Sequence, residues 1–177
     1  MANADTPRGL VPITNPDGNK IPIEYLKVSS GYSSDIAVGT PVVQLSTGFI
    51  VPVTSATPAN QLWVGVSMEF YDASEEGTKA IAIATDPFQK FLIQQNGTTG
   101  GTQAAVGASG SFEDPEVVYT DTELSSCQML AGFTTTISTP LRVIGLHPRS
   151  TNAWGANNDL IVMPILLSHQ RGYSVPV

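Results

Sequence analysis

The sequence has few charged residues and a single cysteine. Charged side chains make up 13% of its 177 residues, about half the usual quarter of a globular protein. Cys127 is the only cysteine, which excludes a disulfide scaffold. Hydrophobic residues make up 41% of the chain, so disorder over its whole length is not expected. The length predicts one domain, or one domain with a tail.

Basic residues are the scarcer of the charged residues. Eight Lys and Arg stand against fifteen Asp and Glu, which gives a formal net charge of −7 and a pI near 4.6. Nucleic acids bind clustered Lys and Arg, and here four of each are scattered along the chain. We therefore expect no nucleic-acid partner.

Long apolar runs are also lacking. The longest candidate, residues 160–167, contains Pro164 and is much shorter than the ~20 residues of a membrane-spanning helix, so we expect no membrane partner. The first residues show no basic region followed by an apolar run, which predicts synthesis in a cytoplasm without a targeting signal. A lone cysteine agrees with a reducing compartment.

Residues that favour strands and turns are abundant. The chain holds 16 Val, 12 Ile and 18 Thr, together with 16 Gly and 13 Pro. This composition is typical of many short strands separated by sharp turns. No window longer than about ten residues combines helical spacing with caps at both ends. The sequence therefore predicts an all-β fold, a compact β-barrel or β-sandwich domain.

Alternation of apolar residues locates the strands. Residues 35–45 lead through residues 46–48 into residues 49–53, which predicts a hairpin with Gly48 at its bend. Residues 62–70 alternate most regularly, which places Val64 and Val66 on one buried face and Trp63 on the other face. Small alanines alternate with isoleucines over residues 79–85, which indicates a close backbone approach from another sheet or subunit. Further strands are predicted at residues 21–28, 90–95, 116–120, 129–137, 141–146 and 160–168, and the Asn-rich loop 148–159 predicts a hairpin or a crossover.

The two ends of the chain differ from this domain. Residues 1–20 contain Pro7, Pro12 and Pro16, which a helix or a central strand does not accommodate, and we interpret them as an extended arm. Residues 21–169 form the predicted β domain, within which the Gly-, Thr-, Ala- and Ser-rich stretch 96–110 is predicted to be a flexible loop. Residues 170–177 are predicted to be an extended tail.

Catalytic motifs are missing from the sequence. It contains no phosphate-binding loop, no nucleophile elbow and no zinc-binding motif. His147 and His169 each lie at or beyond a predicted strand end, where a structural role is usual. Cys127 has no basic neighbour that would lower its pKa, and we predict a small core residue.

Acidic residues are the other candidates for a catalytic or metal-binding site. Three acidic groups could supply a general acid and base, but acidic turns explain them more simply: Glu75-Glu76, Glu113-Asp114 with Glu116, and Asp121 with Glu123. Oxygen ligands for calcium gather at residues 15–19 and 157–159, neither of which has the spacing of a helix-loop-helix calcium site. We therefore predict that the protein is not an enzyme and has no catalytic, cofactor-binding or metal-binding residues.

Several short motifs, taken in order, resemble small virion proteins encoded by tailed bacteriophages. The likeness covers most of the chain, and its specificity lies in the order of the motifs. The matching segments are Met1-Ala2-Asn3-Ala4-Asp5-Thr6-Pro7-Arg8-Gly9-Leu10, Ile36-Ala37-Val38-Gly39-Thr40-Pro41-Val42-Val43 with the Thr47-Gly48 turn, Val64-Gly65-Val66, Asp86-Pro87-Phe88-Gln89-Lys90-Phe91, Leu141-Arg142-Val143-Ile144-Gly145-Leu146, Asn152-Ala153-Trp154-Gly155-Ala156-Asn157-Asn158 and a closing hydrophobic strand that leads to Ser168-His169-Gln170.

The resemblance implies a head decoration, or cement, protein. Such a subunit forms homotrimers on the outer capsid surface and clamps neighbouring capsomers of the major capsid protein, so the expected location is the virion. Several weak contacts presented by one trimer add up to tight binding. The arm is the candidate capsid contact, with Arg8 as its charge-assisted donor, and the candidate capsid-binding residues are Thr6, Pro7, Arg8, Gly9, Leu10, Val11 and Pro12.

Other classes of protein remain open. A tail or baseplate β-domain would also be structural. A host-recognition or glycan-binding module would need an aromatic platform, which is hard to build from 13 aromatic residues that include only Trp63 and Trp154. A small hydrolase built on acidic pairs ranks lowest, and a major coat protein needs a long helix and a longer chain.

Overall fold

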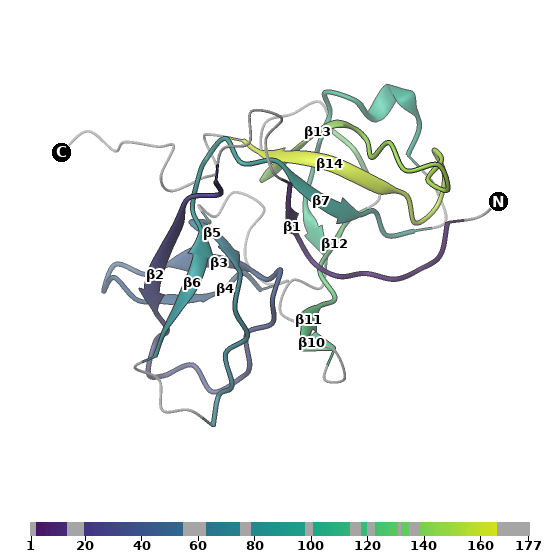
Figure 1. Cartoon of the computed structure of the whole chain (residues 1–177). Coiled ribbons are helices and arrows are strands. Elements are labelled where there is room, and N and C mark those ends of the chain that lie inside the picture. The colour runs from purple at the N-terminus through teal and green to yellow at the C-terminus, as the bar shows by residue number, and fades with distance from the viewer. Residues whose placement is uncertain are drawn as a thin grey trace.

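The computed structural model describes residues 3–13, 20–54, 63–74, 79–97, 101–113, 118–119, 123–130, 132–134 and 139–165. Its fold is all-β, as the sequence predicts, and consists of two five-stranded antiparallel sheets and two smaller two-stranded sheets (Figure 1). The first five-stranded sheet, sheet A, lies beside the second, sheet B. The predicted tail, residues 170–177, lies outside the described residues.

Sheet A has the strand order β1-β7-β14-β13-β8. Its longest pair, β13 and β14, runs from Leu141 opposite Pro164 to Leu146 opposite Leu160, so loop 148–159 closes a hairpin rather than a crossover. The predicted strands at 90–95, 141–146 and 160–168 correspond to three of its members. The strands are β1 (Val11–Pro12), β7 (Phe91–Gln94), β14 (Asp159–Pro164), β13 (Leu141–Leu146) and β8 (Ser109–Gly110).

Sheet B has the strand order β2-β6-β5-β3-β4. The predicted hairpin is present as β3 and β4, with Gly48 at φ 84° in the bend. Directly after β2, Val28 forms a parallel bridge with Ile50 of β4, so the sheet curls and its two outer strands approach each other. The strands are β2 (Ile23–Lys27), β6 (Ala80–Ala84), β5 (Gly65–Ser67), β3 (Pro41–Gln44) and β4 (Ile50–Pro52).

In the stretch predicted as a flexible loop, residues 96–110, the structure describes residues 96–97 and 101–110. This stretch contains the 3-10 helix η1 (Gln103–Ala105) and strand β8, and Ala105 is buried. Ser109 and Gly110 of β8 are buried as well. Two small sheets complete the fold, formed by β9 (Phe112–Glu113) with β12 (Gln128–Met129) and by β10 (Val118–Tyr119) with β11 (Leu124–Ser125).

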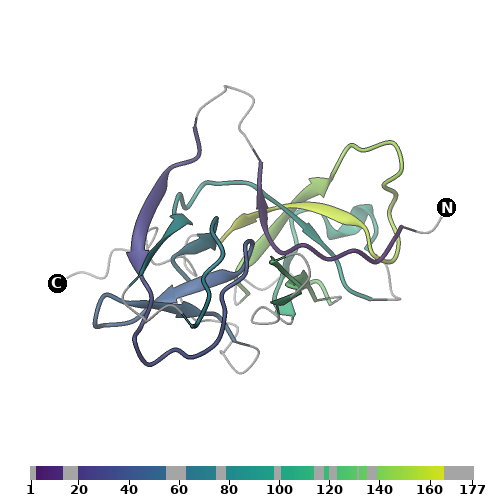
Figure 2. The ribbon, with the colours of Figure 1, turned by 60° about the horizontal axis from the view of Figure 1, so that its bottom comes forward.

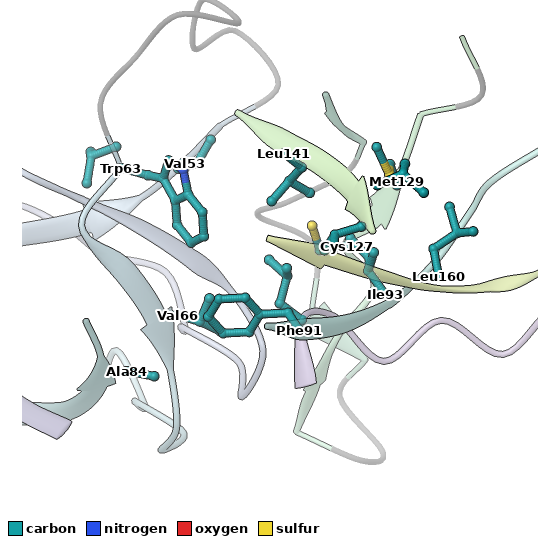
Figure 3. Close-up of a cluster of buried hydrophobic side chains, with 14 residues drawn as sticks. Val53, Trp63, Val66, Ala84, Phe91, Ile93, Cys127, Met129, Leu141 and Leu160 are labelled. Atoms are coloured by element: carbon teal, nitrogen blue, oxygen red, sulfur yellow. The ribbon is translucent and has the colours of Figure 1, made fainter. Parts of the chain in front are cut away.

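Two clusters of buried hydrophobic side chains pack against these sheets. The first involves both sheets (Figure 3) and contains Trp63, whose ring centroid lies 6.1 Å from that of Phe91 and 5.5 Å from that of Phe112. The second packs on the other side of sheet B and consists of Val28, Ile36, Val42, Ile50, Val64, Tyr71, Ile81 and Ile83. Burial of large apolar side chains at about 1.5–3 kcal/mol each is the main source of stability in such clusters.

The prediction that Val64 and Val66 share one face is wrong, because Val64 packs in the second cluster and Val66 in the first. Sheet B is covered on both sides, so β5 has no solvent face, and Trp63 is fully buried. The close backbone approach expected for the alanines occurs within the chain: a Cβ added to Gly65 would lie 2.2 Å from the carbonyl oxygen of Ala84.

Candidate interaction surfaces

The N-terminal segment lies along the chain's own body. We call residues 3–13 the strap; Figures 1 and 2 show it following the surface of the protein. Its strand β1 pairs with β7, with Val11 opposite Leu92. The backbone N–H of Leu10 donates to the carbonyl of Gly39 at 3.0 Å, and the Leu10 side chain is 1% exposed in the first cluster. The strap is extended, as predicted, but it is docked.

Two glycines let the strap approach the body closely. Gly9 has φ 72° and Gly39 has φ 89°, a region that side chains other than glycine rarely adopt. A Cβ on Gly9 would lie 2.7 Å from the Gly39 carbonyl oxygen, and a Cβ on Gly39 would lie 2.9 Å from that of Arg8. Glycine is therefore required on both sides of this contact.

Polar side chains of the body hold the strap's backbone. Gln94, which is buried, accepts a hydrogen bond from the N–H of Thr6 at 3.0 Å and donates to the carbonyl of Ala4 at 2.8 Å. The Asn3 side chain donates to the carbonyl of Ala156 at 2.8 Å, in the loop between β13 and β14. The strap thus follows a defined path over residues that are far away in the sequence.

A buried carboxylate ties the strap to sheet A. Asp159, whose side chain is 2% exposed, accepts a hydrogen bond from Arg8 at 2.9 Å and another from Arg149 at 2.7 Å, both on Oδ2. The arginine side chains are 30% and 49% exposed, but the carboxylate they share is buried, so solvent screens these two ion pairs less than it screens ion pairs between exposed groups. Arg8, expected as a donor to the capsid, donates within its own chain.

The candidate capsid-binding residues therefore differ in accessibility. Gly9 and Leu10 are buried, and Pro7, Arg8 and Pro12 are half-buried. Thr6 and Val11 are exposed, and Val11 shows 38% of its surface. Only this outer side of the docked strap is open to a partner.

The outer side of β2 at Ile23 and Tyr25, where no described strand pairs with it, is a second surface, and the sequence did not reveal it. The N–H of Thr85 donates to the carbonyl of Pro22 at 3.4 Å and that of Val28 to the carbonyl of Lys79 at 3.1 Å. Because alternate residues of an antiparallel strand bond in opposite directions, the backbone groups of Ile23 and Tyr25 point away from β6. The Ile23 and Tyr25 side chains are 47% and 71% exposed.

Residues considered for chemistry do not form a catalytic group in the described part of the chain. There, no three His, Cys, Asp or Glu side chains gather at one point. Cys127 is fully buried in the first cluster, which confirms its prediction as a small core residue. His147 lies just after β13, and its N–H bonds the carbonyl of Asp159 at 3.0 Å. The candidates that lie outside the described residues are Glu75, Glu76, Asp114, Glu116, Asp121, His169 and residues 15–19.

Of the two tryptophans, Trp63 is fully buried and Trp154 is half-buried, with its Nε1 donating to Gln103 at 3.1 Å. The exposed aromatic side chains among the described residues are Tyr25 and Phe88. Across these same residues, none of the helices has the length and apolarity to cross a bilayer. Comparison with family models, curated proteins and solved structures finds no match for the chain.

Proposed function

We propose that the protein is a capsid decoration, or cement, protein of a tailed bacteriophage head. In this proposal it forms a homotrimer on the outer surface of the virion, binds the major capsid protein and stabilises the contacts between capsomers. The order of sequence motifs supports the family, and the all-β fold agrees with it. The protein acts by contact and transforms no molecule.

The docked strap is the observation that carries the proposal. Its inner side is fixed by Leu10, Gln94 and the Arg8–Asp159 ion pair, while Thr6 and Val11 face outward. A segment that is already ordered loses little conformational entropy when it binds. A trimer presents three such segments at once, so weak contacts add through effective concentration.

The strap contacts the capsid while it stays docked. Releasing it would expose the Leu10 side chain, at a cost of about 2 kcal/mol, and would break the ion pair with Asp159. The weak contact that each subunit makes with the capsid does not offset these losses in that subunit. The proposed clamp is therefore a fixed ridge on the surface of the subunit rather than a free arm.

A pair of matched variants tests the strap. Val11→Asp places a charge on the strap, and Val106→Asp places the same charge on η1's C-terminal side; the two valines are 38% and 39% exposed. The assay counts the copies that co-sediment with emptied, expanded capsids lacking the protein. We expect Val11→Asp to bind about tenfold more weakly, or 1.4 kcal/mol, and Val106→Asp to bind like the unaltered protein. Equal binding by both variants rejects the strap's role, and no binding by the unaltered protein rejects the proposed function.

A further inference from the structure

The edge of β2 has the properties of a site for an added strand. No described strand pairs with Ile23 or Tyr25 on the side away from β6. Figures 1 and 2 show β2 at the outer margin of sheet B. Alternating N–H and C=O groups at an open edge bind one kind of ligand well, namely another extended polypeptide.

The side chains at this edge favour a guest that covers them. Ile23 and Tyr25 are two residues apart, so they share one face of the sheet, and they are 47% and 71% exposed. Tyr25 is the most exposed large hydrophobic residue among those described. Cross-strand pairs with aromatic and β-branched side chains contribute about 0.2–1 kcal/mol each, in addition to the backbone hydrogen bonds.

We propose that residues 166–177 of a neighbouring copy add a strand to this edge. This inference rests on the proposed homotrimer and names the contact that holds it together. Charge supports the choice of guest: all fifteen Asp and Glu lie before residue 160, so residues 166–177 carry Arg171 and no acidic residue. A segment of this composition adds no acidic side chain to a chain of net charge −7, and β2 itself carries one exposed residue of each sign, Glu24 and Lys27.

The position and length of the segment also fit. The described chain ends at Ile165, directly after β14, whose C-terminal end points toward sheet B in both ribbon views (Figures 1 and 2). The twelve residues that follow span about 40 Å when extended. That length is enough to leave one subunit and run along a strand of the next.

Symmetry distinguishes this contact from pairing of two β2 edges. Two identical antiparallel edges form a two-fold contact and give a dimer. A ring of three needs two different surfaces on each chain, one that donates and one that accepts. Residues 166–177 and the β2 edge supply these two surfaces.

Three proteins test the proposal in sedimentation: the full chain, the chain ending at Ile165, and Tyr25→Pro in the full chain. Proline at position 25 removes an N–H that points away from β6, so the pairing within sheet B is retained. We expect the full chain to be a trimer and both variants to be monomers. Mixed together, the variants should form a heterodimer, because one keeps the edge and the other keeps the donor segment.

Hydrogen exchange provides the readout at the edge itself. In the full chain, the amides of Ile23 and Tyr25 should exchange about 100-fold more slowly than in the chain ending at Ile165. The amides of Glu24 and Leu26 face β6, so they should be protected in both and report that the shortened chain is folded. If Glu24 and Leu26 lose their protection in the shortened chain, that chain is not folded. The oligomeric state of Tyr25→Pro in sedimentation then tests the proposal.

The outcomes separate this inference from the proposed function. A trimer that persists in both variants overturns the added strand and leaves the homotrimer in place. A full chain that is monomeric, with fast exchange at Ile23 and Tyr25, rejects both. Protection of these two amides in a monomer shows that the segment folds back on its own chain, and a dimer shows that two edges pair; either result overturns the exchange between neighbours.

Discussion

Replacing Leu10 by alanine tests whether the strap belongs to the hydrophobic core. Leu10 is 1% exposed and packs in the cluster that also contains Phe91 and Leu160. Truncation of a buried leucine to alanine costs 2.7–5 kcal/mol in well-packed cores, and we expect about 3 kcal/mol here. This is a large part of the 5–15 kcal/mol by which a domain is stable.

Urea unfolding followed by tryptophan fluorescence measures this loss, because Trp63 lies in the same cluster. With a slope of about 2–3 kcal/mol per molar, Leu10→Ala should lower the midpoint by about 1 M. Val11→Ala is the control: the neighbouring side chain is 38% exposed, so it should cost about 0.5 kcal/mol. Similar losses for the two variants would refute the docked strap, since Leu10 would then contribute no more than a surface residue.

Three further results are expected. Gly65→Ala should destabilise the protein by more than about 2 kcal/mol, because its Cβ meets the Ala84 carbonyl, whereas Gly145→Ala, with no atom within 4 Å, should change the free energy of unfolding by less than about 1 kcal/mol. Replacing both Arg8 and Arg149 by alanine should lower the free energy of unfolding by about 1 kcal/mol more than the sum of the two single replacements, because each single variant still leaves Asp159 one arginine partner. Additive losses in this double-mutant cycle would contradict the shared carboxylate. Hydrogen bonds from the Ser74 side chain and then its backbone lower the pKa of Asp72 below 3.8, so this carboxylate's contribution to stability is present above pH 3.8 and is lost as the pH falls through the lowered value. An NMR titration should show the Asp72 pKa moving up toward 3.8 in Ser74→Ala, and an unchanged pKa would contradict the assignment.

Local sequence patterns were sufficient for two hairpins but not for every strand: in the described part of the predicted strand 129–137, only Met129 lies in a strand and Thr134 makes an isolated bridge. The bend at Gly48 and the pair β13–β14 follow from alternation and turn residues over a few positions. Cys127 could be placed in the core because it lacks charged neighbours. Each of these features depends on residues that are close together in the chain.

The path of the strap could not be predicted, because its partners are distant. Arg8 bonds Asp159, 151 residues away, and Thr6 bonds Gln94, 88 residues away. Residues 96–110 show a different limit: a run of small side chains does not indicate the 3-10 helix η1 or the strand β8 that lie within this stretch. The free edge of β2 depends on which strands pair with it, which a single strand does not encode.

Electron cryomicroscopy of emptied, expanded capsids mixed with the protein is the most direct test of head decoration. We predict three-fold protrusions on the outer shell, seated where capsomers meet, each fitting three copies of the two-sheet fold with the outer side of the strap facing the coat. Bare heads at saturating protein concentration, or density confined to the tail, would contradict it.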